Sequence, residues 1–96
     1  MPLFRVYKDI FECVKDGSKK IEVRNRLIRG SEAVFMCGRE VIRKKITDVK
    51  EFSLNDGFLS QKWKMIVPKA GNENEAKERL LNIFPDGEKF YAYFIE

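Results

Sequence analysis

The sequence has no histidine and only two cysteines. Without histidine, a Ser-His-Asp triad, a Cys-His dyad, a His-ligated zinc site and haem ligation by histidine are all excluded. Two cysteines cannot build a structural zinc site, and they are too few for a secreted disulfide scaffold. We therefore expect no metal and no cofactor. Cys13 and Cys37 are expected to be small core residues.

Long apolar runs are also missing, since the longest span only about six residues, whereas a membrane helix needs about 20. The first ten residues, MPLFRVYKDI, contain no cleavable hydrophobic region. Repeats, low-complexity segments and linkers are absent as well. We therefore expect one cytoplasmic domain over residues 1–96, monomeric and without membrane contact.

What the chain does have is a folding composition and an uneven charge. It is 44% hydrophobic and carries a net charge of +4. Residues 1–50 hold 13 basic and 7 acidic side chains, and the excess is densest between Lys15 and Lys45, with ten basic against four acidic side chains. This predicts one electropositive face that attracts phosphate or another anion. A merely solvated surface is the alternative.

Two segments have helix signals at both ends. The first begins at Asp9, with Glu12 completing a capping box, and ends at Gly17, a typical left-handed stop. The second begins at Asn72, with Glu75 in a second capping box, and ends before the next proline. Between them we expect only a short helical turn at 58–59, and residues 61–67 fit no clear pattern.

Strand signals occur in five segments, namely 3–7, Lys19–Leu27, Ala33–Cys37, Glu40–Phe52 and Phe90–Ile95. In the longest of these, the apolar residues change parity between Ile46 and Val49, which predicts a bulge of the kind that closes small barrels. The last segment is too apolar for an open edge. The expected fold is therefore α+β, a small closed five-stranded β-barrel with two or three flanking helices.

The sharpest local feature is the run from Gly17 to Arg24, GSKKIEVR. Glu22 and Arg24 are two residues apart on a strand, so their side chains point to the same face. Lys19 has the opposite parity, but it follows a glycine turn that can direct it toward the same place. The three side chains either floor a ligand cleft or form an internal ion pair that orients the strand.

This Gly-x-Lys-x-x-Glu-x-Arg pattern resembles the signature of the ASCH domain, a member of the PUA-like superfamily of small β-barrels. The resemblance extends to nearly the whole chain, from the strand and helix LFRVYKDIFECVKDG to the terminal strand YAYFIE. It implies a cleft beside the barrel, suited to RNA or a modified nucleoside, with Lys19, Glu22 and Arg24 at its floor.

Some ASCH relatives are amidohydrolases that act on acetylated cytidine, using a lysine, a threonine three residues later and a distant glutamate. Lys19 matches that lysine, but Glu22 stands in the place of the threonine nucleophile. Glu73 matches the distant glutamate only if the alignment is shifted. The resemblance therefore argues against this activity, and Lys19 and Glu22 remain the candidates for any other chemistry.

Further basic and aromatic residues near the motif in sequence or in the predicted barrel are candidates for RNA contacts. The basic candidates are Lys20, Arg26, Arg43 and Lys45, of which the last two share one face of a strand. Trp63 and Tyr91 are candidate platforms for an unpaired base, with core packing as the alternative for each.

The favoured function is an RNA- or nucleotide-binding module with its cleft at the motif. Two alternatives remain. One is a hydrolase that acts on RNA or a modified nucleoside, and the other is a protein-interaction module of a translation or transcription assembly.

Overall fold

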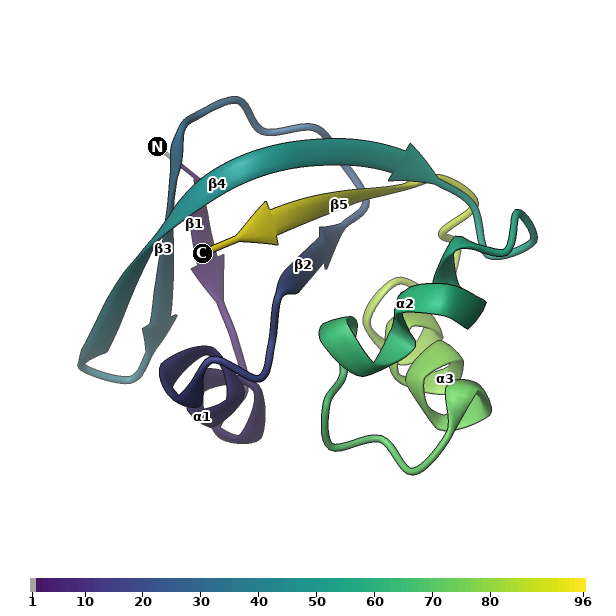
Figure 1. The fold of residues 1–96 in the computed structure, drawn as a ribbon, viewed down its shortest axis with the longest axis horizontal. Coiled ribbons are helices and arrows are strands. Elements are labelled where there is room, and N and C mark those ends of the chain that lie inside the picture. The colour runs from purple at the N-terminus through teal and green to yellow at the C-terminus, as the bar shows by residue number, and fades with distance from the viewer. Residues whose placement is uncertain (1) are drawn as a thin grey trace.

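The computed structural model describes residues 2–96, so Met1 of the predicted domain lies outside the described residues. One mixed sheet with strand order β1-β3-β4-β5-β2 is accompanied by three helices (Figure 1). The elements in chain order are β1 (Leu3–Arg5), α1 (Lys8–Asp16), β2 (Ile21–Arg24), β3 (Glu32–Cys37), β4 (Glu40–Phe52), α2 (Phe58–Ile66), α3 (Glu73–Ile83) and β5 (Phe90–Ile95).

The sheet curls into a half-barrel, and the prediction of a closed barrel is wrong. β1 and β2 are its two edges, and both are short because the predicted strands 3–7 and Lys19–Leu27 leave the sheet early. After β2 the chain no longer pairs as a strand, and the side chain of Tyr93 holds its backbone instead. The Tyr93 hydroxyl donates to the carbonyl of Arg26 and accepts from the N–H of Ile28. The half-barrel is therefore open between β1 and β2.

β4 and β5 fulfil what their sequences predict. β4 curves across the molecule, pairing with β3 along its first part and with β5 along its second (Figure 1). Its register against β5 shifts between Ile46 and Asp48, which confirms the predicted bulge. β5 lies between β4 and β2, so the apolar run FYAYFI has a hydrogen-bonded neighbour on both sides.

α1 ends where predicted but begins earlier. Gly17 has a φ of 84° and its N–H donates to the carbonyl of Val14, as expected of a left-handed stop. The N-cap is Tyr7, so Asp9 already lies in the first turn and the predicted capping box with Glu12 is wrong. The Asp9 carboxylate accepts hydrogen bonds from the Ile10 N–H and from the Arg79 side chain of α3.

α2 is a nine-residue helix where the sequence predicts only a short turn at 58–59. Leu59 and Ile66, seven residues apart, are buried on the same side of this helix. Because most helix stability in proteins comes from tertiary packing, this buried face stabilises a helix that its mixed sequence pattern did not indicate.

α3 has the predicted N-terminus. Asn72 is its N-cap, and the Asn72 Oδ1 accepts a hydrogen bond from the Glu75 N–H at 2.9 Å. The Glu75 carboxylate reaches one residue further back than a capping box requires, and accepts from the Gly71 N–H at 2.6 Å. The helix ends with Phe84 as its C-cap, directly before Pro85.

The core consists of two hydrophobic clusters. One joins α1 to β1 and β3 around Phe4, Phe11 and Phe35. The other joins α2 and α3 to β2 and β5 around Ile66, Leu80 and Phe90, and Figure 1 shows these two helices beside each other and apart from α1. Cys13 is buried in the core, as expected, whereas Cys37 is half-buried and packs against the cluster around Phe4. Among residues 2–96, no helix is both long and apolar enough to span a membrane.

Candidate functional site

The glycine turn after α1 directs Lys19 inward. The Lys19 N–H donates to the carbonyl of Cys13 at 3.0 Å, which reverses the chain. The side chain is then only 3% exposed. Its Nζ donates at 2.5 Å to the carbonyl of Ile66, the last residue of α2. A carbonyl at a helix C-terminus lacks an intrahelical partner, and the helix dipole favours a cation there.

Lys19 forms an ion pair with Glu22 inside the protein. Its Nζ lies 3.2 Å from the Glu22 Oε1, and Glu22 is 5% exposed. Burial lowers the pKa of Lys19 below its ordinary value of 10.5, while the adjacent Glu22 carboxylate acts in the opposite direction. The ammonium group is therefore stabilised at this position mainly by Glu22.

Arg24 completes the cluster from the same face of β2, as the two-residue spacing predicts. Its Nε and Nη2 donate to the Glu22 Oε2 at 3.0 and 2.6 Å. The Nη2 also donates to the carbonyl of Arg5 at 3.2 Å, and the guanidinium lies 4.8 Å from the centre of the Phe4 ring. Arg24 therefore bridges β2 to β1 across the open side of the half-barrel. Lys19, Glu22 and Arg24 are called the floor cluster below.

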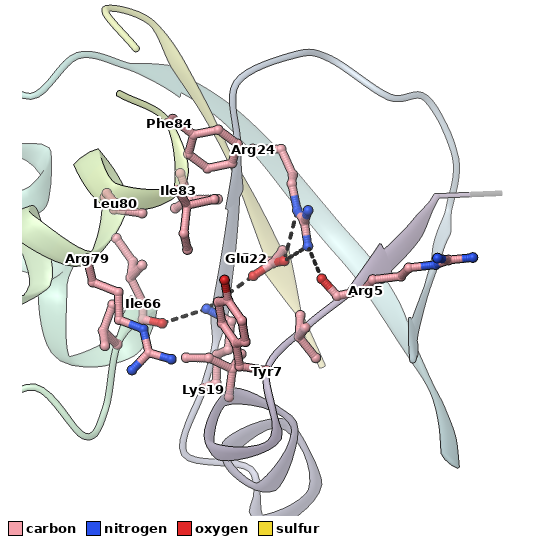
Figure 2. A pocket seen from close by; sticks show the side chains of 14 residues that line it. Arg5, Tyr7, Lys19, Glu22, Arg24, Ile66, Arg79, Leu80, Ile83 and Phe84 are labelled. Carbon is pink, nitrogen blue, oxygen red and sulfur yellow. Dashed lines mark hydrogen bonds and ion pairs between the residues drawn. The ribbon is translucent and has the colours of Figure 1, made fainter. Parts of the chain in front are cut away.

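The floor cluster lies at a pocket of about 330 Å³. Apolar side chains from β2, α3 and the segment around β1 form much of its lining, and Figure 2 shows Ile83 and Phe84 on one side with Tyr7 in front. The residues that line it are Arg5, Val6, Tyr7, Ile10, Lys19, Glu22, Val23, Arg24, Ile66, Val67, Arg79, Leu80, Ile83 and Phe84. Four are basic and one is acidic, so the lining is electropositive.

Arg79 and Tyr7 are pocket residues that the sequence analysis missed. Arg79 reaches from α3 to α1, where its Nη1 and Nη2 donate to the two Asp9 carboxylate oxygens at 2.6 and 2.7 Å. Its guanidinium also lies 5.9 Å from the centre of the ring of Tyr7, a residue that is 66% exposed. The hydrogen bonds from Arg79 hold the pKa of Asp9 below 3.8, and those to Asp9 raise the pKa of Arg79. Both side chains are therefore charged at neutral pH.

The other candidates from the sequence do not line this pocket. Lys20, Arg26, Arg43 and Lys45 are exposed elsewhere on the surface, and Arg43 pairs with Glu32 at 3.0 Å. Trp63 and Tyr91 are half-buried against the two hydrophobic clusters. Within residues 2–96, no three side chains of the metal-ligating kinds gather closely enough to hold a metal ion.

The likeness of this chain to known proteins lies in its fold. A scan against family models and a search of curated proteins find no match. Among solved structures, the hypothetical protein PH0355 superposes with a TM-score of 0.75 at 19% identity, over 98% of this chain and 95% of that one. The ASCH protein from Zymomonas mobilis superposes with a TM-score of 0.73 at 16% identity, over 98% of this chain and 65% of that one. A mutant form of the Zymomonas protein gives a TM-score of 0.68 at 14% identity.

The chain therefore has an ASCH-type fold, and its curled half-barrel fits the PUA-like architecture that the sequence resemblance implies. It spans about two thirds of the length of the Zymomonas proteins.

Proposed function

We propose that the pocket binds a nucleotide-like ligand, either free or as an unpaired nucleotide of an RNA. The observation that carries this proposal is a buried, charged cluster at the floor of a pocket with largely apolar walls. Small-molecule sites typically combine such walls with a few placed polar groups, in cavities of roughly 300–1,000 Å³. An ion pair with a structural role alone needs no pocket above it.

The lining provides counterparts for the base and the phosphate of a nucleotide. Apolar walls and the exposed Tyr7 ring suit the flat faces of a base. The Glu22 Oε2 already accepts two hydrogen bonds from Arg24, whereas the Oε1, paired with Lys19, keeps a further lone pair that can accept an N–H of a base edge. The Arg24 Nη1 takes part in none of the hydrogen bonds around the cluster, and the positive lining favours a phosphate.

Membership of the ASCH family and RNA binding are parts of the same proposal. The Gly17-to-Arg24 motif and the ASCH-type fold support the family, since the motif residues Lys19, Glu22 and Arg24 meet at one place in the fold. The proposed compartment is the cytoplasm, where RNA ligands are present.

The lining favours binding over hydrolysis by a covalent route. None of the residues that line the pocket is a serine, a threonine or a cysteine, so Tyr7 offers the only side-chain hydroxyl within this described set. Both Glu22 oxygens and the Lys19 ammonium are engaged with each other or with Arg24 and Ile66. The hydrolase alternative would therefore have to rely on an activated water.

The test compares two arginines of the same segment. Fluorescence anisotropy of short labelled single-stranded RNAs is measured for the wild type, Arg24→Gln and Arg26→Gln across a salt series. Arg24 lines the pocket, whereas Arg26 is exposed and does not. We expect Arg24→Gln to weaken binding by about tenfold or more, because hydrogen bonds to charged groups contribute about 1.5–3 kcal/mol. Arg26→Gln should change affinity by less than about threefold.

Equal losses in both variants would contradict the pocket and indicate only a general attraction of positive charge. A larger loss in Arg43→Gln or Lys45→Gln than in Arg24→Gln would place RNA on the face of β4. Turnover of the RNA that disappears in Glu22→Gln would favour the hydrolase alternative. Capture of a protein partner that resists ribonuclease would favour the interaction module. Thermal unfolding checks that each variant is folded.

A further inference from the structure

Arg79 stands between two cavities. It lines the pocket above the floor cluster, and it also lines a neighbouring cavity of about 550 Å³. Tyr7 and Ile83 line both cavities as well, and Figure 2 shows Arg79 and Ile83 on the side away from Arg5, with the Tyr7 ring drawn between Arg79 and Arg5. Tyr7 is 66% and Ile83 44% exposed. The two cavities are therefore separated by side chains that solvent can reach, and not by tightly packed core residues.

The other cations of the pocket offer no free pair of parallel N–H donors to a phosphate at the floor cluster. Lys19 is buried, with its Nζ at Glu22 and at the carbonyl of Ile66. Arg24 donates from its Nε and Nη2 to Glu22, which leaves its Nη1 as a single donor and not a fork. Arg5 lines the pocket, but Figure 2 shows its side chain extending away from the floor cluster. A ligand phosphate therefore finds no unengaged arginine fork at the floor of the pocket.

Arg79 offers such a fork once its present partner leaves. Its Nη1 and Nη2 each donate to a different oxygen of Asp9, the parallel arrangement by which arginine recognises both carboxylate and phosphate. The side chains of Arg79 and Asp9 are 28% and 39% exposed. Ion pairs in contact with water hold their partners weakly, and water can solvate the released carboxylate.

We propose that Arg79 is the phosphate-binding residue of the pocket, and that the Asp9 carboxylate occupies this position until a ligand phosphate replaces it. The proposal rests on the proposed function in that it takes the phosphate to be that of a nucleotide. A phosphodiester or a monoester offers the same oxygens to the arginine fork, so the shared chemistry is a phosphate group.

The charges of the neighbouring cavity direct the phosphate to the pocket side of Arg79. Asp9, Glu75 and Glu78 line that cavity, and Arg79 is its one basic lining residue. The negative charges of these carboxylates repel a phosphate, whereas the pocket on the other side of Arg79 is lined by three further basic residues. The ligand phosphate is therefore expected to meet Arg79 from the pocket and not from the acidic cavity.

The test is isothermal titration calorimetry with adenosine, adenosine 5′-monophosphate, uridine, uridine 5′-monophosphate and inorganic phosphate. We expect Asp9→Asn to raise the affinity for phosphate-bearing probes by about threefold to fivefold, because a partly exposed ion pair holds its partner no more strongly than that. Its affinity for the nucleosides should stay within about twofold. Arg79→Gln should remove the preference for a monophosphate over its nucleoside.

Glu78→Gln is the matched control. It changes the charge of the same cavity by the same amount, and Glu78 makes no ion pair with Arg79 in the described structure. An equal gain of phosphate affinity in Glu78→Gln would show a long-range charge effect and overturn the proposal. Asp9→Ala is measured beside Asp9→Asn, and thermal unfolding confirms that both are folded.

Failure of this proposal is distinguishable from failure of the proposed function. If the nucleosides bind, but no phosphate-bearing probe binds either Asp9 variant more tightly than the wild type, the role of Arg79 is wrong and the pocket function stands. If inorganic phosphate binds through Arg79 while no base is recognised, the role of Arg79 stands and nucleotide recognition is wrong. If no probe binds any variant, both proposals are wrong.

Discussion

Replacing Glu22 by glutamine should destabilise the fold strongly at neutral pH. The change removes the negative charge between Lys19 and Arg24, and Lys19 is 4% exposed with the carbonyl of Ile66 as its other acceptor. Removing one partner of a buried ion pair costs about 3–5 kcal/mol, because the remaining charge stays buried without compensation. This is a large share of the roughly 5–15 kcal/mol by which small domains are stable.

The loss should depend on pH in a defined direction. Burial already lowers the pKa of Lys19 below 10.5, and Glu22 opposes that shift. Without Glu22 the pKa of Lys19 falls further. Between this lowered value and 10.5 the unfolded chain binds more protons than the folded one, so the free energy of unfolding rises with pH. Glu22→Gln should therefore regain part of its lost stability between pH 7 and pH 9.5, and more of it than the wild type gains.

Urea unfolding followed by the fluorescence of Trp63, which packs against the core, measures both effects. Lys19→Met is the comparison, because it leaves Glu22 paired with Arg24 and should cost only about 1–2 kcal/mol. The double variant should resemble Lys19→Met more than Glu22→Gln. The reasoning is refuted if Glu22→Gln lies within about 1 kcal/mol of the wild type at pH 7 and shows no added stability at pH 9.5.

Three further changes test other contacts. Asp9→Asn should lower the free energy of unfolding by less than about 1 kcal/mol at pH 7. Arg79 holds the pKa of Asp9 below 3.8, so the pair stabilises the fold above pH 3.8 and loses this contribution as the pH falls through the lowered pKa. The free energies of unfolding of wild type and variant should therefore converge at low pH. Tyr93→Phe should cost about 1–3 kcal/mol in urea unfolding, because its hydroxyl is hydrogen-bonded to two backbone groups in the connection after β2. Amide hydrogen exchange in that connection should become faster, and unchanged exchange would contradict this role of the hydroxyl. Gly17→Ala should cost about 1–2 kcal/mol through backbone strain at a φ of 84°, and a melting temperature equal to that of the wild type would contradict it.

Features decided by neighbours along the chain were predictable. A glycine after an amphipathic segment ends α1 at Gly17, and a parity change in β4 marks the bulge after Ile46. The two-residue spacing of Glu22 and Arg24 places both side chains on one face, where they pair. In each case the relevant interaction lies within a few residues, so the pattern contains the information.

Features decided by distant partners were not predictable. Asp9 and Arg79 are 70 residues apart, and nothing in either local sequence indicates that α1 and α3 meet. The predicted capping box is wrong because α1 begins at Lys8 with Tyr7 as its N-cap, so that Asp9 lies within the first turn and its carboxylate pairs with Arg79. α2 is stabilised by packing against α3 and β2, and closure of the sheet depends on how β1 and β2 lie relative to each other. Helix and strand propensities and hydrophobic periodicity describe neither the packing of α2 nor the closure of the sheet.

The location of the ligand on the protein is the most direct test of the pocket. A nuclear magnetic resonance titration of the isotopically labelled protein with adenosine and uridine 5′-monophosphates reports it residue by residue. We predict saturable shifts in the backbone signals of residues 5–7, 19–24 and 79–84, with little change at 43–45 on β4. Shifts that cluster at 43–45 while the pocket residues stay unchanged would contradict the central claim that the floor cluster lies beneath a nucleotide-binding pocket.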